Sequence, residues 1–151
     1  MNYDSTRDTL QHIRSVQAFL SDVIDEMMTR GIMHDVSKLD DPEKSMYDEF
    51  TPKLKGVTYG SDEYKEYLDQ MGVALKHHYE HNRHHPEHFE WGIHEMNLID
   101  LIEMLCDWKA ASLRHGDGDM TKSLEINRNR FDIEDQLYNI FMNTIHDMGW
   151  D

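Results

Sequence analysis

The recurrence of apolar side chains every three or four residues constrains the fold of this chain more than any other feature. The first stripe comprises Leu10, Ile13, Val16, Leu20, Ile24 and Met27. Another comprises Leu98, Leu101, Ile102, Leu105 and Trp108. This spacing places each set on one face of an amphipathic helix, and no stretch alternates convincingly as a strand does. The sequence therefore predicts an all-α fold, a single bundle of about six helices in one domain spanning residues 1–151.

Local signals predict the ends of the first two helices. Ser5 and Asp8 have the spacing of a capping box, which predicts the start of the first helix. Gly31 is expected to terminate that helix, since glycine adopts the backbone conformation common at helix ends. Asp41 followed by Pro42 predicts a second helix, with the aspartate as N-cap and the proline at the first helical position.

Four further helices are expected in the rest of the chain. Ser61 predicts the N-cap of a helix that runs through residues 64–78 into a histidine-rich stretch and ends before Pro86. The others are expected at residues 93 to about 114, roughly 121–130 and roughly 133–147. Asp132 with Asp135 predicts a capping box for the last of them.

The histidine-rich stretch is the strongest chemical signal. It holds six of the eleven histidines, namely His77, His78, His81, His84, His85 and His88. Imidazole is the commonest transition-metal ligand in proteins. Six neighbouring histidines cannot all bind one ion, and helical phase places His78, three residues after Leu75, towards the core. The predicted ligands from this stretch are His78, His84 and His85, and most of the others are expected to be solvated.

Other segments offer residues that would complete such a site. His12 lies at the edge of the first apolar stripe, His34 and Asp35 are adjacent, and Asp107 lies on the later helix that carries Trp108. Each has a plain structural alternative: a boundary histidine, a helix cap or a solvated carboxylate. Taken together, they predict a mixed imidazole and carboxylate site for Mn²⁺, Fe²⁺, Co²⁺, Ni²⁺ or Zn²⁺, with one or two ions per chain.

Charge and composition exclude several classes of function. The chain has 15 basic and 30 acidic residues and a net charge of −15, which disfavours binding to nucleic acid duplexes. No apolar run approaches the ~20 residues that a membrane span requires. The single Cys106 excludes an internal disulfide. The simplest expectation is a cytoplasmic protein that does not bind membranes.

The ordered set of His12, the His34-Asp35 doublet and Asp107 resembles the pattern of the HD-domain metal-dependent phosphohydrolase superfamily. The run from His34 to Lys38 is similar to an extended form of that doublet. The whole chain also looks similar to small uncharacterised HD-like proteins of phages and bacteria, which would place it in the host cytoplasm if phage-encoded. The resemblance implies an HD-domain-like helical bundle, a homodimer in many members, and hydrolysis of a nucleotide or related small phosphate ester by metal-activated water.

That mechanism assigns roles to several neighbouring residues. Lys38 or Arg83 would contact a phosphoryl oxygen, and Glu80 would act as a general acid or base. Asp100 and Glu103 would orient ligand imidazoles. Two alternatives remain open from the sequence. One is an acidic helical binding protein, such as a DNA mimic or an inhibitor of a host enzyme, and the other is a metal-binding HD-like fold without catalysis.

Overall fold

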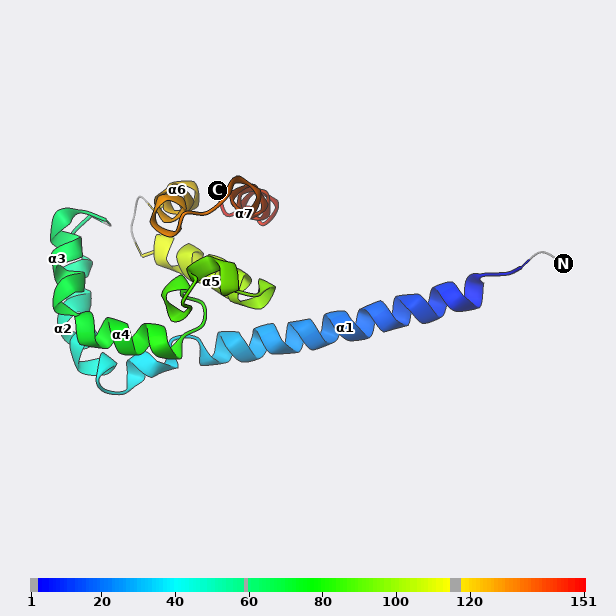
Figure 1. Ribbon diagram of the computed structural model, residues 1–151, viewed down its shortest axis with the longest axis horizontal. Coiled ribbons are helices and arrows are strands. Elements are labelled where there is room, and N and C mark those ends of the chain that lie inside the picture. The colour runs from blue at the N-terminus through cyan, green and yellow to red at the C-terminus, as the bar shows by residue number, and fades with distance from the viewer. Residues whose placement is uncertain (1–2, 59, 115–117) are drawn as a thin grey trace. The chain divides into compact units, whose positions relative to one another are not determined.

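The computed structural model describes residues 3–58, 60–114 and 118–151, and within them the chain is all-α (Figure 1). These residues form seven α-helices and three short 3₁₀ helices, η1 to η3, and contain no strand. The predicted fold class is therefore confirmed. Contacts group the chain into two compact units, residues 1–34 and 35–151. The predicted single domain over the whole chain stays a prediction.

The first unit is one unbroken helix, α1 (Thr6–Met33). The predicted capping box is wrong, because the Ser5 side chain accepts no hydrogen bond from the helix. The side-chain acceptor at this helix start is Asp4, whose carboxylate accepts hydrogen bonds from the backbone N–H and the hydroxyl of Thr6 at 3.0 and 2.6 Å. The predicted stop at Gly31 is also wrong. Glycine costs a helix interior only about 1 kcal/mol relative to alanine, so α1 continues for two more residues.

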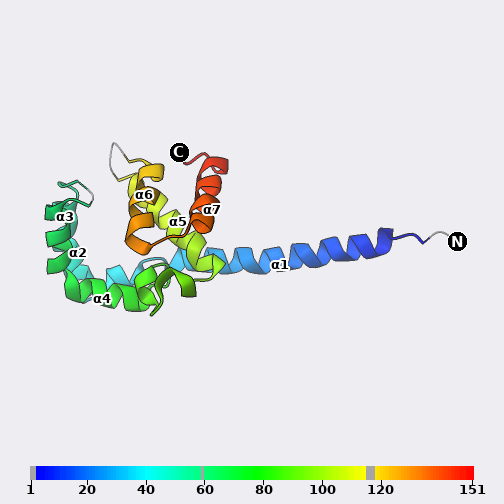
Figure 2. The same cartoon turned by 45° about the horizontal axis from the view of Figure 1, so that its top comes forward.

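The second unit begins with four elements that pack together (Figure 2). They are η1 (Val36–Leu39), α2 (Glu43–Leu54), α3 (Asp62–Gln70) and α4 (Gly72–His81). Ser61 caps α3 as predicted, since its hydroxyl accepts a hydrogen bond from the backbone N–H of Tyr64 at 3.2 Å. The α2 helix starts one residue later than predicted, with Pro42 at the N-cap.

The helix predicted to run from Ser61 into the histidines is broken in two. Met71, which is fully buried, leaves helical geometry with φ −82° and ψ 7°, and α4 begins at Gly72. This break explains why the described part of the chain has seven α-helices where the sequence predicts about six. The end before Pro86 is confirmed, because α4 stops at His81 and both Asn82 and His85 have extended backbone.

The rest of the second unit packs around a separate apolar cluster. Its elements are η2 (Pro86–His88), η3 (Gly92–Glu95), α5 (Leu98–Ser112), α6 (Met120–Phe131) and α7 (Asp135–Asp147). The buried cluster comprises Met104, Leu105, Trp108, Met120, Leu124, Ile133, Phe141 and Ile145. The α5 helix starts five residues later than predicted, because Asn97 and Asp100 form a capping box. The predicted capping box at Asp132 is wrong, since Asp132 adopts the left-handed conformation that ends α6.

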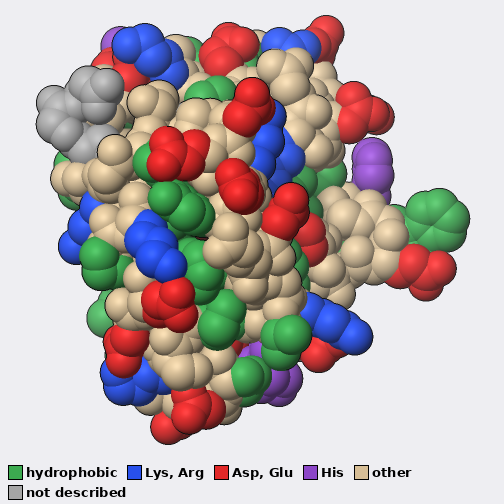
Figure 3. All heavy atoms as spheres, turned by 90° about the vertical axis from the view of Figure 1, so that its left-hand side faces the viewer, with side chains coloured by type: hydrophobic (Ala, Val, Ile, Leu, Met, Phe, Trp, Pro, Cys, Tyr) green, Lys and Arg blue, Asp and Glu red, His purple; other side chains and the backbone are tan. Residues whose placement is uncertain are grey.

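The surface mixes side chains of different kinds. On the face formed by α2, α3 and α4, acidic, basic and hydrophobic side chains are interspersed, and no single kind covers it (Figure 3). None of the helices in the described residues, the 28-residue α1 included, combines the length and the apolar composition needed to cross a membrane.

Candidate metal centre

Asp35 lies at the sharp turn that opens η1. Its backbone is in the left-handed region, with φ 58° and ψ 13°, a conformation that few residues other than glycine, asparagine and aspartate tolerate. The turn is closed by a backbone hydrogen bond from Lys38 N–H to Asp35 C=O at 2.9 Å. The Lys38 ammonium also donates to Asp35 Oδ2 at 2.5 Å. Asp35 is thus held by its own backbone and by a neighbouring cation.

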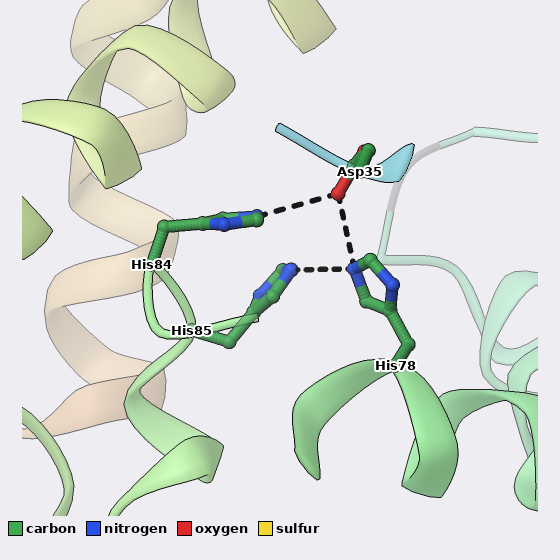
Figure 4. Close-up of side chains that lie close together, drawn as sticks. All are labelled: Asp35, His78, His84 and His85. Atoms are coloured by element: carbon green, nitrogen blue, oxygen red, sulfur yellow. Dashed lines mark hydrogen bonds and ion pairs between the residues drawn. The ribbon is translucent and has the colours of Figure 1, made fainter. Parts of the chain in front are cut away.

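Three histidines approach Asp35 from α4 and from the segment that follows it (Figure 4). His78 lies in the last turns of α4 and is buried. Asn82 then ends the helix, because its side-chain amide donates to the backbone carbonyl of His78 and to the Ser37 hydroxyl, both at 2.8 Å. The chain then reverses through a turn at residues 83–84, closed by a backbone hydrogen bond from His85 N–H to the Asn82 carbonyl at 3.3 Å. This turn places buried His84 and partly buried His85 beside His78.

The four side chains have the spacing of atoms around one ion. His78 Nε2 lies 2.9 Å from His85 Nε2 and 3.2 Å from Asp35 Oδ1. His84 Nε2 lies 3.5 Å from the same Asp35 oxygen, and all four ligand atoms lie within 4.8 Å of one another. Ligands at ~2.1 Å from a metal are separated by about 3.0 Å in octahedral and about 3.4 Å in tetrahedral geometry. The observed distances span that range.

Two carboxylates, one buried and one partly buried, set which nitrogen of each ring faces the cluster. Glu43 Oε2 lies 2.8 Å from His78 Nδ1, and Glu103 Oε1 lies 3.2 Å from His84 Nδ1. A carboxylate only accepts, so both Nδ1 atoms carry the proton and donate. In a neutral ring the Nε2 lone pair then points into the cluster, which is the usual arrangement of metal-binding histidines. Glu103 therefore lies where it can orient the imidazole of His84, the role that the sequence predicted for it.

The Nε2 atoms of two rings lie close to one oxygen of Asp35. With the proton on Nδ1, His78 and His84 both direct the Nε2 lone pair at Asp35 Oδ1, at 3.2 and 3.5 Å. Such contacts repel unless each ring takes up a second proton or all of them share a cation. One shared divalent ion relieves every contact at once. The donor set, three imidazoles and a carboxylate, thus fits a divalent transition metal.

The electrostatics of the cluster keep its ligands in metal-binding form. Burial, reinforced by neighbouring His84 and His78, lowers the pKa of His85 from 6.5 to about 2. Its imidazole is therefore neutral at physiological pH, the form that coordinates metals. For Glu43, burial alone would raise the pKa, but hydrogen bonds involving His77, Ser37 and His78 outweigh it and lower the pKa below the usual value. Glu43 is thus ionised and able to accept.

The remaining predicted ligands differ in where they lie. Asp107 is half-buried on α5, and one of its carboxylate oxygens comes within 4.8 Å of one of Asp35, so the structure brings it to the edge of the cluster. His12 is on α1, and His34 is the last residue of the same unit, joined to Asp35 by the peptide bond. His12 and His34 stay predicted ligands.

The predicted catalytic residues are placed very differently from one another. Lys38 lies beside the cluster, 4.9 Å from the centre of the Tyr47 ring in addition to its contact with Asp35. Arg83 is half-exposed and forms a two-pronged ion pair with Asp100 at 3.2 and 3.0 Å. Asp100 pairs with this arginine and also caps α5 through its hydrogen bond with the backbone N–H of Asn97. Glu80 is on the exposed side of α4, 3.8 Å from Lys76, and the structure does not bring it to the cluster.

Sequence reasoning missed two residues on which the cluster depends. Glu43 is fully buried and contacts both His77 and His78, and buried Asn82 ties α4 to η1. In the sequence Glu43 is an ordinary acidic residue in the first turn of a helix. An Asn within a histidine-rich run could have suggested a helix end, but its contact with Ser37 arises only from tertiary packing.

A comparison with known protein families finds a match that spans the whole cluster but names no activity. A sequence profile described as a family of unknown function, DUF5662, matches residues 1–147. The chain belongs to the DUF5662 family. The region matched to DUF5662 includes every residue of the cluster from Asp35 to Asp107. No curated protein and no solved structure matches the chain.

Proposed function

We propose that this member of the DUF5662 family binds a divalent transition metal and hydrolyses a phosphate ester of a nucleotide or related small molecule. The observation that carries the proposal is the convergence of Asp35, His78, His84 and His85. Two of the three imidazoles are oriented by carboxylates, Glu43 for His78 and Glu103 for His84. Burying a carboxylate and three imidazoles side by side costs desolvation free energy, and we expect a bound cation to compensate that cost.

The residues divide into ligands and groups that hold them. Asp35, His78, His84 and His85 would hold the metal, with Asp107 at the edge of the same cluster. His12 and His34 are further ligands predicted from the sequence. Mn²⁺, Fe²⁺, Co²⁺, Ni²⁺ and Zn²⁺ all accept such a donor set. Bound there, the metal would supply Lewis acidity, which lowers the pKa of water towards neutrality and offsets charge on a phosphoryl group.

Lys38 supplies the positive charge that an anionic substrate needs in an acidic protein. Its ammonium lies 2.5 Å from Asp35 Oδ2, and its side chain is 27% exposed, so it is both beside the cluster and accessible. A phosphate oxygen near the cluster would therefore meet a fixed cation, which stabilises charge that develops during hydrolysis. Arg83 is also accessible, but its guanidinium pairs with Asp100, which is not one of the four clustered ligands.

The proposal is tested on the full-length chain purified without added metal. Bound metal is counted per chain, and phosphate release is then measured from nucleoside mono-, di- and triphosphates with Mn²⁺, Co²⁺, Ni²⁺ and Mg²⁺. We expect tight binding of at least one transition metal and turnover of at least one phosphate ester. Absence of bound metal, with no rise in melting temperature on metal addition, would overturn the metal centre.

A metal centre without catalysis is the second candidate, because the same cluster supports it. It predicts metal binding with no phosphate release from any of these esters. The acidic binding protein has weaker support, since it gives no reason for Asp35 and three histidines to converge. The described surface over α2, α3 and α4 also mixes charges of both signs (Figure 3).

A further inference from the structure

The helix α1 has an apolar face that no other element of its own unit covers. It is the only helix of that unit, spans 28 residues and has no buried residue. Apolar side chains recur every three or four residues along it, and this stripe comprises Leu10, Ile13, Val16, Leu20, Val23, Ile24, Met27 and Met28. Because helical propensity alone is marginal in water, such a helix gains most of its stability by packing its apolar face on another surface. The stripe therefore requires a partner.

The stripe is nearly symmetric about the middle of the helix. The midpoint of Thr6–Met33 falls between residues 19 and 20. In an antiparallel pair that overlaps along its full length, each residue lies opposite the residue equally far from that midpoint on the second helix. Val16 then lies opposite Val23. Every other member of the stripe meets an apolar residue within one position, in the pairs Leu10–Met28, Ile13–Met27, Val16–Ile24 and Leu20–Leu20.

The charges beside the stripe match the same pairing with opposite signs. Arg14 and Asp25 are equally far from the midpoint, so each arginine lies opposite an aspartate of the second helix. They are eleven positions apart, close to three helical turns, so both lie on the same side of the stripe. Same-side positions face each other in a symmetric antiparallel pair, which brings Arg14 and Asp25 together twice. On the other side of the stripe, Asp8 comes within one position of Arg30.

Charge disfavours the two simplest alternatives. A parallel pair would place Asp22, Asp25 and Glu26 at the same level in both helices, and like charges in contact repel. The second unit of the same chain is itself strongly acidic, since only five of the 30 acidic residues and three of the 15 basic residues lie within residues 1–34. Charge therefore favours the α1 helix of a second copy as the partner.

We infer that α1 pairs in antiparallel orientation with α1 of a second copy of this chain. The apolar stripe forms the centre of the interface, and the two Arg14–Asp25 pairs set its orientation and register. His12 lies at the edge of the stripe and not in its centre, so the pairing is compatible with its predicted role as a ligand. The inference does not depend on the proposed hydrolysis, because none of the interface residues belongs to the cluster of Asp35, His78, His84 and His85.

The test is sedimentation equilibrium of the full-length chain over a range of concentrations. The unchanged chain should form a dimer. Leu20→Glu places two carboxylates at the midpoint of the pair, so this variant should be monomeric. Arg14→Glu should raise the dimer Kd by roughly 10-fold, because two attractive pairs become repulsive. The double variant Arg14→Glu with Asp25→Arg exchanges the charges and should restore the original Kd.

Lys65→Glu is the matched control, because it makes the same charge reversal on an exposed lysine of α3 and should leave the Kd unchanged. Three results would overturn the inference. A monomer at every concentration would mean that the stripe packs on its own chain or on another protein. A dimer that survives Leu20→Glu would mean that the interface lies elsewhere. A double variant that dimerises no more tightly than Arg14→Glu alone would exclude the antiparallel register. Failure of the metal centre would appear instead as a change in metal content, so the two claims fail separately.

Discussion

Histidines lie on both faces of α4, but their surroundings differ. His78 is buried, and its Nε2 meets Asp35 and His85 at 3.2 and 2.9 Å. His81, three residues later, is exposed and stacks on His77. Both faces belong to one histidine run and share Glu43. The difference comes from what η1, the 82–85 segment and α5 bring to one face and not to the other.

This contrast shows that histidine content alone does not make a buried site. On the inner face, every imidazole has displaced water and must be compensated by a carboxylate, a hydrogen bond or a cation. On the outer face, water can hydrogen-bond to any imidazole that loses its partner. Substitutions on the inner face should therefore have large effects on metal binding, and those on the outer face should have small effects on stability.

The largest effect is expected from Asp35→Ala. This change removes the oxygen that lies within 3.5 Å of both His78 and His84 and is the anionic ligand shared by the cluster. Tight metal binding should be lost, and phosphate release with it, as measured by metal content after gel filtration. Asp48→Ala, which removes an exposed aspartate of α2, is the matched control and should bind metal normally.

Glu43→Gln should weaken the buried centre without abolishing it. The glutamine keeps the size of the side chain but accepts less strongly from His78 Nδ1, which then orients its lone pair less firmly. Loss of such a supporting carboxylate typically costs about 10- to 100-fold in metal affinity. Isothermal titration with Zn²⁺ measures it, and Glu49→Gln, an exposed residue of α2, is the control. Equal affinities in the two variants would contradict the role given to Glu43.

Lys38→Ala should separate catalysis from metal binding. The ammonium is beside the cluster but is not a ligand, so the metal content should stay unchanged. Loss of a charged contact to a phosphoryl group should lower kcat/KM by roughly 10- to 100-fold. Lys65→Ala on α3, an exposed lysine, provides the comparison. An unchanged kcat/KM in the Lys38→Ala protein would show that Lys38 does not contribute to catalysis.

The smallest effect on stability is expected from His81→Ala. The side chain is exposed, and alanine has the higher helix propensity, so the free energy of unfolding should change by less than about 0.5 kcal/mol. Urea denaturation followed by circular dichroism measures this change. A loss of several kcal/mol would mean that the outer face supports the fold, and the contrast between the two faces would fail.

The sequence predicted the fold class well because helical periodicity is a local property. Ser61 and the helix end before Pro86 were found from local signals alone. The break at Met71 was missed, because it depends on burying that side chain between packed helices. The Ser5 capping box was wrong because Asp4 supplies the competing acceptor.

Sequence reasoning finds those site residues whose position follows from helical phase. It misses those that tertiary packing brings to the site. His78 follows from its distance to the apolar stripe, and the His34-Asp35 doublet marks one end of the cluster. Glu80 lies close to the predicted ligand His78 in the sequence. Residues two apart on a helix point to nearly opposite faces, so Glu80 lies on the exposed side of α4 while His78 is buried. Glu43, on a different helix, carries no local signal of its contact with His78.

X-ray absorption spectroscopy of the chain loaded with one equivalent of Zn²⁺ tests the central claim most directly. The account predicts a first coordination shell of nitrogen and oxygen only, at about 2.0–2.1 Å, with multiple scattering from about three imidazoles. The Asp35→Ala chain should lose this spectrum. A shell of water oxygens without imidazole scattering, or a spectrum unchanged by Asp35→Ala, would contradict a metal centre built from Asp35, His78, His84 and His85.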